Sequence, residues 1–389
     1  MALDPNTIVE TLGTILPGPA VLHEPTFSGN EWDYVKECLD TGWVSSAGKY
    51  VDKFEDMLAG VTGAGHAIAT VTGTAALHTA LVLAGVKAGD EVIVPALTFV
   101  GTANAVTQAG AIPHFADSEE RTLGLDPAKL DEHLSRIADI NGNVCRNKKT
   151  GKRIAAVVCV HIFGHPVDLD ALASVCNKYE LALIEDAAES LGSTYKGRHT
   201  GNHGCLSVLS FNGNKTVTTG GGGAILTNDP DLAKAAKHLT TTAKLPHKWE
   251  YGHDQAGFNY RLPNINAALG CAQLEQLPGF IVQKRQLAKA YTNAFSNIPG
   301  LRFFTEPDFA KSNYWLNALL LDAENAGLKD DILAATNDNN FMTRPAWVPM
   351  HHLQMFQECP KMDLTVSEGL YGRLINIPSS PGLAVELDA

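Results

Sequence analysis

Short apolar runs alternate with longer segments of helical period between about Gly65 and Ser210. The apolar runs predict strands at residues 67–71, 91–94, 154–160 and 181–184. The amphipathic segments predict helices at residues 74–85, 99–109 and 170–179. Strands that are apolar at nearly every position, and that alternate with helices, are typical of a parallel sheet covered on both faces. The sequence therefore predicts an α/β fold for this part of the chain.

The pattern changes after about Pro263. Helical periodicity covers residues 266–277 and 282–295, and residues 314–321 then alternate as a strand does, so we expect a smaller α+β domain here. The polar, turn-rich stretch 140–153 is expected to be a surface excursion between two strands. We divide the chain into an N-terminal segment (1–30), a large α/β domain (31–255) and a small C-terminal domain (256–389).

Composition places the chain among globular proteins with a large core. It has 389 residues, of which 45% are hydrophobic and 19% charged, which excludes a disordered segment, a coiled coil and a collagen. Lysine and arginine number 30 against 42 aspartates and glutamates, so the formal net charge is −12. A molecule of that charge has no overall attraction for nucleic acid or for an anionic membrane. A phosphate-bearing ligand must therefore be held by local donors.

Targeting and metal-binding signals are missing from the sequence. The first five residues lack the basic and apolar regions of a secretory signal, and no apolar run is long enough to span a bilayer. The seven cysteines are scattered without a Cys-x-x-Cys pair, which argues against a disulfide framework and against a zinc site built on cysteine. His161 and His165 have i, i+4 spacing, but Gly164 and Pro166 exclude a stable helix there. We expect a cytoplasmic protein without a metal.

Three βα turns carry candidate chemistry. Thr72-Gly73-Thr74-Ala75 follows a predicted strand and opens a helix, where glycine and free N–H groups favour a phosphate. Asp186 follows the strand at 181–184, at the strand end where ligands of open α/β sheets bind. Lys215 stands between an apolar stretch that ends at Ser210 and a run of four glycines. Taken singly, these residues are also explained as helix caps and a surface lysine.

Together the three elements are the parts that a pyridoxal 5′-phosphate site needs. A lysine bonds covalently to the cofactor aldehyde, an aspartate keeps the pyridine nitrogen protonated, and a helix N-terminus takes the phosphate. Unrelated caps and a surface lysine explain the pattern less well, because all three parts occur in order along the chain. The sequence therefore predicts pyridoxal 5′-phosphate as a cofactor.

Motifs between about Pro25 and Pro381 extend this pattern over nearly the whole chain. They are Thr41-Gly42-Trp43-Val44-Ser45-Ser46, Gly73-Thr74-Ala75-Ala76-Leu77, Pro95-Ala96-Leu97-Thr98-Phe99, Glu185-Asp186-Ala187-Ala188, Ser210-Phe211 with Lys215, Thr218-Thr219-Gly220, Gly257-Phe258-Asn259-Tyr260-Arg261 and Pro349-Met350-His351. In this order they resemble the DegT/StrS-type sugar-nucleotide aminotransferases, pyridoxal phosphate enzymes of the aspartate aminotransferase fold (fold type I). The resemblance implies a large domain with a mostly parallel sheet flanked by helices, and a smaller C-terminal α+β domain.

The resemblance also implies roles for individual residues. Lys215 is expected to be the catalytic lysine that attaches to the cofactor, Asp186 the partner of the pyridine nitrogen, and Phe99 the ring that stacks on the cofactor. Further cofactor contacts are expected from Gly73, Thr74, Ala75, Glu189, Ser210 and, reaching in from the neighbouring subunit, Asn259. The sugar-nucleotide cleft is expected to be lined by Trp43, Ser45, Arg261, Arg344 and His351.

Several of these residues have a purely structural alternative. Phe99 could belong to the core, as most phenylalanines do, and Ser210 could cap a turn. Trp43 could anchor the N-terminal segment, and His351 with His352 could form a surface pair. These alternatives stay open on the sequence alone.

At three positions this sequence differs from the residues that are commonest in the family. Glu189 stands where Gln or His is frequent, Asn212 where His is frequent, and Gly221 where Glu is frequent. Family dehydratases replace the catalytic lysine with histidine, and Lys215 argues against that variant. The departures leave the chemistry intact but leave the identity of the sugar open.

The implied activity is a two-stage transamination. L-Glutamate gives up its amino group and leaves as 2-oxoglutarate, and a nucleotide-linked keto sugar accepts that group. The wording of Asn212–Lys215 and Arg344–Trp347 is similar to the bacillosamine and legionaminic acid branch, whose substrate is a 4-keto-6-deoxy-N-acetylhexosamine. The alternatives are another 4-ketosugar nucleotide, such as the GDP-perosamine precursor, and a regulatory protein that binds pyridoxal phosphate without turnover. A homodimer with shared active sites is expected.

Overall fold

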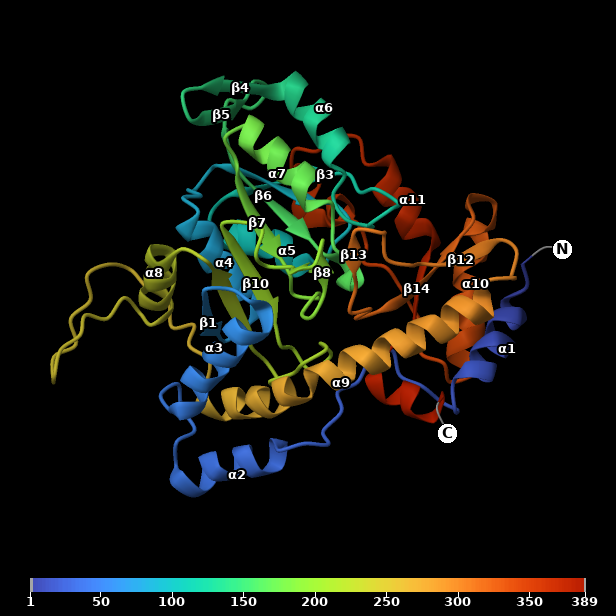
Figure 1. The fold of residues 1–389 in the computed structure, drawn as a ribbon. Helices are drawn as coiled ribbons and strands as arrows, with labels where there is room; N and C mark the ends of the chain where they lie inside the picture. Colours follow the sequence, from blue (N-terminus) through green and yellow to red (C-terminus); the bar gives the residue numbers. More distant parts are fainter. Residues whose placement is uncertain (1–2, 388–389) are drawn as a thin grey trace.

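A large mixed sheet forms the centre of the fold in the computed structural model, which describes residues 3–387 (Figure 1). Its main strands are, in spatial order, β1 (His66–Thr70), β11 (Gly223–Thr227), β10 (Leu206–Ser210), β7 (Ala182–Asp186), β6 (Arg153–Val160), β2 (Glu91–Pro95) and β3 (Ile112–Ala116). The pairs from β10 to β3 are parallel, and only β11 runs antiparallel to its two neighbours. The predicted α/β class with a mostly parallel sheet is confirmed.

Helices cover both faces of this sheet because its strands send alternate side chains to opposite sides. Val92 and Val94 of β2 enter the core under one helical layer, whereas Ile93 between them enters the core under the other. The first layer contains α4 (Gly73–Leu83), α5 (Val100–Gln108) and α8 (Pro230–Thr240). The second contains α3 (Lys49–Thr62), α6 (Pro127–Ile137), α7 (Leu169–Lys178) and the first half of α9 (Asn264–Phe295).

A second, antiparallel sheet lies in the C-terminal part of the chain. Its order is β12 (Leu301–Phe303), β14 (Asn317–Leu321), β16 (Leu374–Ile377) and β15 (Arg344–Pro345). One face packs against α1 (Pro5–Ile15), α10 (Lys329–Asp338) and the second half of α9, and the other against α11 (Thr365–Arg373). The N-terminal helix thus joins the C-terminal sheet, and the domain division at residues 30 and 255 stays a prediction.

Short elements complete the described chain. Helix α2 (Glu31–Thr41) packs on α9, and the segment between α8 and α9 extends away from the body of the molecule (Figure 1). A small sheet joins β8 (Thr194–Tyr195), β9 (Arg198–His199) and β13 (Ala310–Lys311). The 3-10 segments are η1 (Ile162–Gly164), η2 (Ala323–Leu328), η3 (Met350–His352), η4 (Gln354–Phe356) and η5 (Pro381–Leu387).

One local expectation needs correction. The sequence predicts two helices at 266–277 and 282–295, but α9 runs unbroken from Asn264 to Phe295. Pro278 lacks the N–H that continues a helix, yet Leu274 and Leu277 before it and Phe280 and Leu287 after it are all buried, so packing on both sides keeps the helix continuous.

The predicted excursion at 140–153 contains most of a β-hairpin, which pairs with the first residues of β6, a central strand of the large sheet. Its strands β4 (Ala138–Asn141) and β5 (Val144–Asn147) pair with each other, and β5 also pairs with β6. The Asn-Gly dipeptide at its tip is a hairpin signal in its own right.

Within the described residues, no helix combines the length and the apolar composition that crossing a bilayer requires.

Candidate active site

The carboxyl ends of neighbouring strands open into one cavity of about 370 Å³. Strand β7 ends there at Asp186, β10 ends there at Ser210, and α4 begins there at Gly73. This is the position at which ligands bind to open α/β sheets. Seven of the residues that the sequence predicts for the site line the cavity, namely Gly73, Thr74, Phe99, Asp186, Glu189, Ser210 and Lys215.

The first turn of α4 supplies an anion-binding corner. Thr72 caps the helix, because its Oγ1 accepts a hydrogen bond from the Ala75 N–H at 3.0 Å. Position 73, which follows the cap, requires glycine, because a Cβ there would lie only 2.9 Å from the Ser210 Cβ. This close approach places the Ser210 hydroxyl beside a helix N-terminus, where N–H groups and the helix dipole favour a negative charge. The corner can therefore hold a phosphate.

Asp186 is a buried carboxylate that faces the cavity. Its Oδ2 accepts a hydrogen bond from the Thr102 hydroxyl at 2.8 Å, and its Oδ1 accepts one from the Ala188 N–H at 3.2 Å. Burial raises the pKa of Asp186 above its usual value, and the Thr102 hydrogen bond opposes that rise. No cationic side chain of the described residues forms an ion pair with it. Lys215 and His161 also lower the pKa of Asp186 through their charges, but neither side chain forms an ion pair with it, so a cation in the cavity would find a carboxylate without an ion-pair partner.

Lys215 enters the cavity from the loop between β10 and β11. Its Nζ lies 3.7 Å from the centroid of the Trp315 ring and 3.4 Å from Glu189 Oε1. The indole N–H of Trp315 donates to the Asn214 carbonyl at 2.7 Å, which ties the ring to the residue before Lys215. With a side chain only 13% exposed, the lysine amine is held in place and largely shielded from bulk water.

Glu189 presents a titratable group directly beside that amine. Its Oε2 accepts a hydrogen bond from the Phe163 N–H at 2.8 Å, while Oε1 faces Lys215. Burial raises the pKa of Glu189 to about 7, although Lys215 opposes the rise. The carboxyl group can therefore gain or lose a proton near neutral pH.

Phe99 provides an aromatic surface at the cavity and is not a core residue. It is 54% exposed, and its ring centroid lies 6.5 Å from that of Trp347, which also lines the cavity. The alternative of a buried Phe99 is therefore wrong. An exposed ring in this position can stack on a planar ligand.

These features fit pyridoxal 5′-phosphate. The carboxylate of Asp186, which has no ion-pair partner among the described residues, matches the protonated pyridine nitrogen, and the exposed Phe99 ring matches the flat pyridine. The α4 corner with Ser210 matches the phosphate, and the amine of Lys215 matches the aldehyde. None of the residues that line the cavity calls for a ligand of another chemical class.

Ala75 is placed differently from the other predicted phosphate ligands. It is buried, does not line the cavity, and commits its N–H to the Thr72 cap. A direct contact between Ala75 and the cofactor stays a prediction.

Asn259 and Arg261 lie outside the cavity of their own chain. Residues 257–261 run beside the end of β1, where the Val71 N–H donates to the Tyr260 carbonyl. Tyr260 packs inward against the first helical layer, whereas Asn259 and Arg261 on either side of it are exposed. The two exposed side chains bond each other, with Arg261 Nη2 3.0 Å from Asn259 Oδ1. Side chains alternate in direction along an extended segment, so Asn259 and Arg261 both point outward.

The predicted substrate residues are also outside the cavity. Trp43 is 59% exposed and lines a separate hollow beside the start of α9, and Ser45 is exposed next to it. Arg344 is exposed on β15 and donates to the Asn337 side chain at 2.9 Å. Within this chain the structure does not bring these residues to Lys215, and their roles stay predictions.

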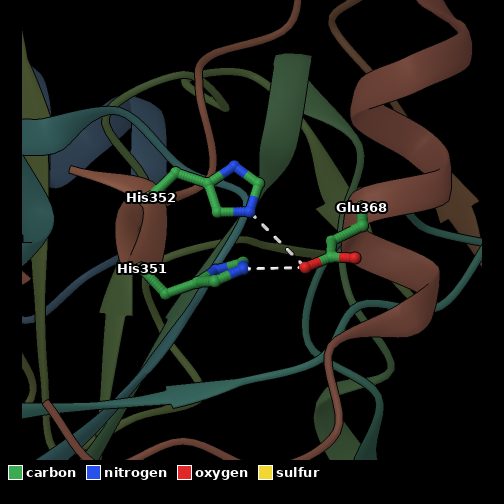
Figure 2. Close-up of side chains that lie close together, drawn as sticks. All are labelled: His351, His352 and Glu368. Atoms are coloured by element: carbon green, nitrogen blue, oxygen red, sulfur yellow. Dashed lines mark hydrogen bonds and ion pairs between the residues drawn. The ribbon is translucent and has the colours of Figure 1, made fainter. Parts of the chain in front are cut away.

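His351 is buried, which contradicts the alternative of a surface pair with His352. Its Nε2 lies 3.0 Å from Glu368 Oε1, and the His352 Nε2 lies 3.5 Å from the same oxygen (Figure 2). The three side chains come together from η3 and α11, away from the cavity lining. A contact of His351 with a sugar nucleotide stays a prediction.

Several residues of the cavity were not identified from the sequence. The sequence gives only a weak indication of Thr102, namely its position one helical turn after Thr98. In the structure the two hydroxyl oxygens lie 3.2 Å apart. Trp315 and Trp347 carry no local signal, because they lie 100 and 132 residues after Lys215 in the chain and reach the cavity only through the fold. Asn214 belongs to the motif at residues 212–215, but that motif does not predict the hydrogen bond between the Asn214 carbonyl and Trp315.

Comparison with known proteins gives a consistent picture. Residues 25–387 match the DegT/DnrJ/EryC1/StrS aminotransferase family. The chain is 36% identical over 365 residues to GDP-perosamine synthase of Escherichia coli O157:H7, covering 94% of each chain. It is 37% identical to EpsN of Bacillus subtilis (strain 168), a proposed pyridoxal phosphate-dependent aminotransferase, covering 93% of this chain and 91% of EpsN. The crystal structure of DesI in the presence of its TDP-sugar product superposes with a TM-score of 0.81 at 28% identity, covering 95% of this chain and 91% of DesI.

Proposed function

The chain belongs to the DegT/DnrJ/EryC1/StrS aminotransferase family, and on that premise we propose that it aminates C4 of a nucleotide-linked 4-keto-6-deoxy-N-acetylhexosamine. L-Glutamate is the amino donor, and 2-oxoglutarate and the 4-amino sugar nucleotide are the products. The observation that carries the proposal is the single cavity that brings Lys215, Asp186 and the first turn of α4 together.

The cofactor is pyridoxal 5′-phosphate, which when bound supplies an electron sink that acidifies the α-carbon of an attached amine. In the first half-reaction Lys215 Nζ takes the proton from the α-carbon of glutamate. In the second half-reaction the same nitrogen delivers a proton to C4 of the sugar. Trp315 and Glu189 keep this amine in one position between the two steps, because they contact Nζ at 3.7 and 3.4 Å.

The surrounding residues prepare the cavity for these proton movements. The carboxylate of Asp186, oriented by Thr102, stabilises positive charge at the ring nitrogen. Ser210 and the α4 N-terminus hold the phosphate. Glu189 buffers the charge of Lys215, since a carboxyl group with a pKa of about 7 can be neutral or ionised at the working pH.

The sugar is proposed from the wording of residues 212–215 and 344–347, which resembles the bacillosamine and legionaminic acid branch. A specific observation favours a second candidate. The similarity to GDP-perosamine synthase, at 36% identity over nearly the full length of both chains, supports the GDP-perosamine precursor, another 4-ketosugar nucleotide. Both candidates share the amination of C4.

We further propose that the active enzyme is a homodimer with shared sites. Asn259 and Arg261 point outward from their own chain, so each is free to enter the site of a second copy. Trp43 and Ser45, which lie away from their own cavity, are proposed to line the sugar-nucleotide cleft in the same assembly.

An assay of the purified protein with glutamate and a panel of UDP-, GDP- and dTDP-linked 4-ketosugars tests the function. We expect stoichiometric 2-oxoglutarate and 4-amino sugar nucleotide with an N-acetylated substrate of the panel, and none with the Lys215→Ala control. Turnover of the GDP-linked substrate alone would establish the second candidate. Cofactor binding without any 2-oxoglutarate would identify a regulatory protein and overturn both.

A further inference from the structure

A cluster of metal-ligating side chains lies outside the cavity. Among the described residues, His351, His352 and Glu368 are the group of histidine, cysteine and carboxylate side chains in which three ligand atoms converge, all within 4.8 Å of one another. Figure 2 shows the two imidazoles of η3 directed at the carboxylate of α11. The sequence predicts no metal, because the two segments are brought together only by the fold.

The spacing of the three ligand atoms suits a first-row divalent ion. Glu368 Oε1 lies 3.0 Å from His351 Nε2 and 3.5 Å from His352 Nε2. Ligands bound to zinc at about 2.1 Å in tetrahedral geometry are roughly 3.4 Å apart. These two distances lie on either side of that value, and all three ligand atoms lie within 4.8 Å of one another, so an ion can be bound after the side chains adjust around it.

The donor set selects the ion. Two imidazole nitrogens and one carboxylate oxygen are ligands for zinc and its neighbours, whereas calcium and magnesium prefer oxygen donors throughout. The His352 side chain is 46% exposed and that of Glu368 53%, so solvent can fill the remaining coordination position. Two hydrogen bonds to one carboxylate oxygen would produce the same distances without an ion, and the test must separate these explanations.

We propose that His351, His352 and Glu368 bind one Zn²⁺ ion, which fastens α11 to the turn at η3. That turn follows Trp347, which lines the active-site cavity, and the Met350 N–H donates to the Ala96 carbonyl at 2.8 Å, in the loop that leads to Phe99. Residues 366 and 367 at the start of α11 are anchored to Asp117 of the large domain. A bound ion therefore reduces the mobility of η3 and α11, the segments that pack behind the cavity wall.

Titration of the cofactor-loaded, tag-free protein with Zn²⁺, and separately with Co²⁺, tests the site. The Glu368→Gln variant keeps an oxygen that can accept hydrogen bonds but is a poor metal ligand, and His352→Gln keeps a polar side chain of similar reach. Both positions are half exposed, so neither change threatens folding. His238→Ala is the matched control, since it belongs to a His–carboxylate pair with one histidine only. Cys205 is an exposed thiol that could bind zinc by itself, so all proteins in the experiment carry Cys205→Ser.

We expect one equivalent of Zn²⁺ by calorimetry, the visible absorption of a low-symmetry Co²⁺ site, and a higher unfolding temperature with zinc. Glu368→Gln and His352→Gln should each weaken binding at least tenfold and abolish the rise in unfolding temperature, whereas His238→Ala should change neither. Equal binding by parent and both variants, or no stoichiometric binding by the parent, would overturn the site and leave the hydrogen-bond explanation.

Discussion

Asp186 is held in the cavity by two hydrogen bonds, and it has no ion-pair partner among the described residues, so its charge is left to face a ligand. Asp186→Asn keeps the acceptor for Thr102 and removes the charge that holds the ring nitrogen protonated. We expect the glutamate half-reaction to slow by roughly two to three orders of magnitude, the range for removal of one electrostatic stabiliser from an active site. Rapid-mixing measurement of 2-oxoglutarate release gives the rate.

Cofactor content of the Asp186→Asn protein is the control, because weak binding would mimic a slow step. The cofactor-free variant should be as stable as the parent or more so, since it no longer buries an unpaired carboxylate. A rate close to that of the parent would reduce Asp186 to a structural residue of the turn after β7, where it accepts the Ala188 N–H.

Glu189 makes stability depend on pH. Burial raises its pKa from 4.5 to about 7, so the folded protein binds a proton more tightly than the unfolded chain. The resulting stabilisation is fully present below the unfolded pKa and is lost as pH rises through the folded pKa. Relative to Glu189→Gln, the cofactor-free parent should lose about 2.5 kcal/mol of unfolding free energy between pH 5 and pH 8.

Urea unfolding of both proteins across that pH range measures the difference. Glu324→Gln, at a solvent-exposed glutamate, is the control and should run parallel to the parent. Parallel curves for Glu189→Gln as well would show that the carboxyl group is ionised in the folded protein throughout.

At the scale of elements, the contact between α4 and β10 forms the phosphate corner. A Cβ on Gly73 would lie 2.9 Å from the Ser210 Cβ and 3.3 Å from the Leu209 carbonyl oxygen, so α4 must move to admit it. Such overpacking costs about 1–3 kcal/mol. We expect Gly73→Ala to weaken cofactor binding roughly tenfold or more, measured by titration of cofactor-free protein with pyridoxal phosphate.

Gly279→Ala is the matched control for that change. Gly279 lies in α9, where an added Cβ meets nothing within 4 Å, and alanine is the better helix former. The control should bind cofactor like the parent and be equally or more stable. Unchanged affinity in Gly73→Ala would mean that the phosphate does not sit at the start of α4.

At the scale of the whole molecule, exposed residues on one chain are proposed to complete the site of another. Asn259 and Arg261 are exposed, and the projecting segment before them carries Trp249 and Tyr251 with 71% and 79% exposure. Apolar surface of this kind marks interaction sites. A complementation experiment decides whether the sites are shared.

The two inactive variants are Lys215→Ala and a chain with Asn259→Asp and Arg261→Ala. If sites are shared, each mixed dimer has one intact site, so random pairing after co-refolding should restore about a quarter of parental activity. If both elements serve one chain's own site, every site stays defective and the mixture remains inactive. Each variant refolded alone is the control.

Much of the fold was predictable from the sequence because its signals are local. The strands β1, β2, β6 and β7 coincide with apolar runs, and Lys215, Asp186 and Ser210 stand in motifs at strand ends. The continuity of α9 through Pro278 was not predictable, since burial of side chains on both sides overrides the local preference of proline. The hairpin at β4 and β5 likewise depends on pairing with β6.

The sequence alone determined the α/β class, the order of its elements and the three residue types that a pyridoxal phosphate site requires, because periodicity and strand-end motifs are properties of neighbouring residues. Only the tertiary structure decided that Trp315 and Trp347 complete the cavity and that Asn259, Arg261 and Trp43 stand outside it. Only the fold brings Glu368 to His351 and His352. These are contacts between segments far apart in the chain, and their geometry is set by how sheets and helices pack rather than by any local pattern.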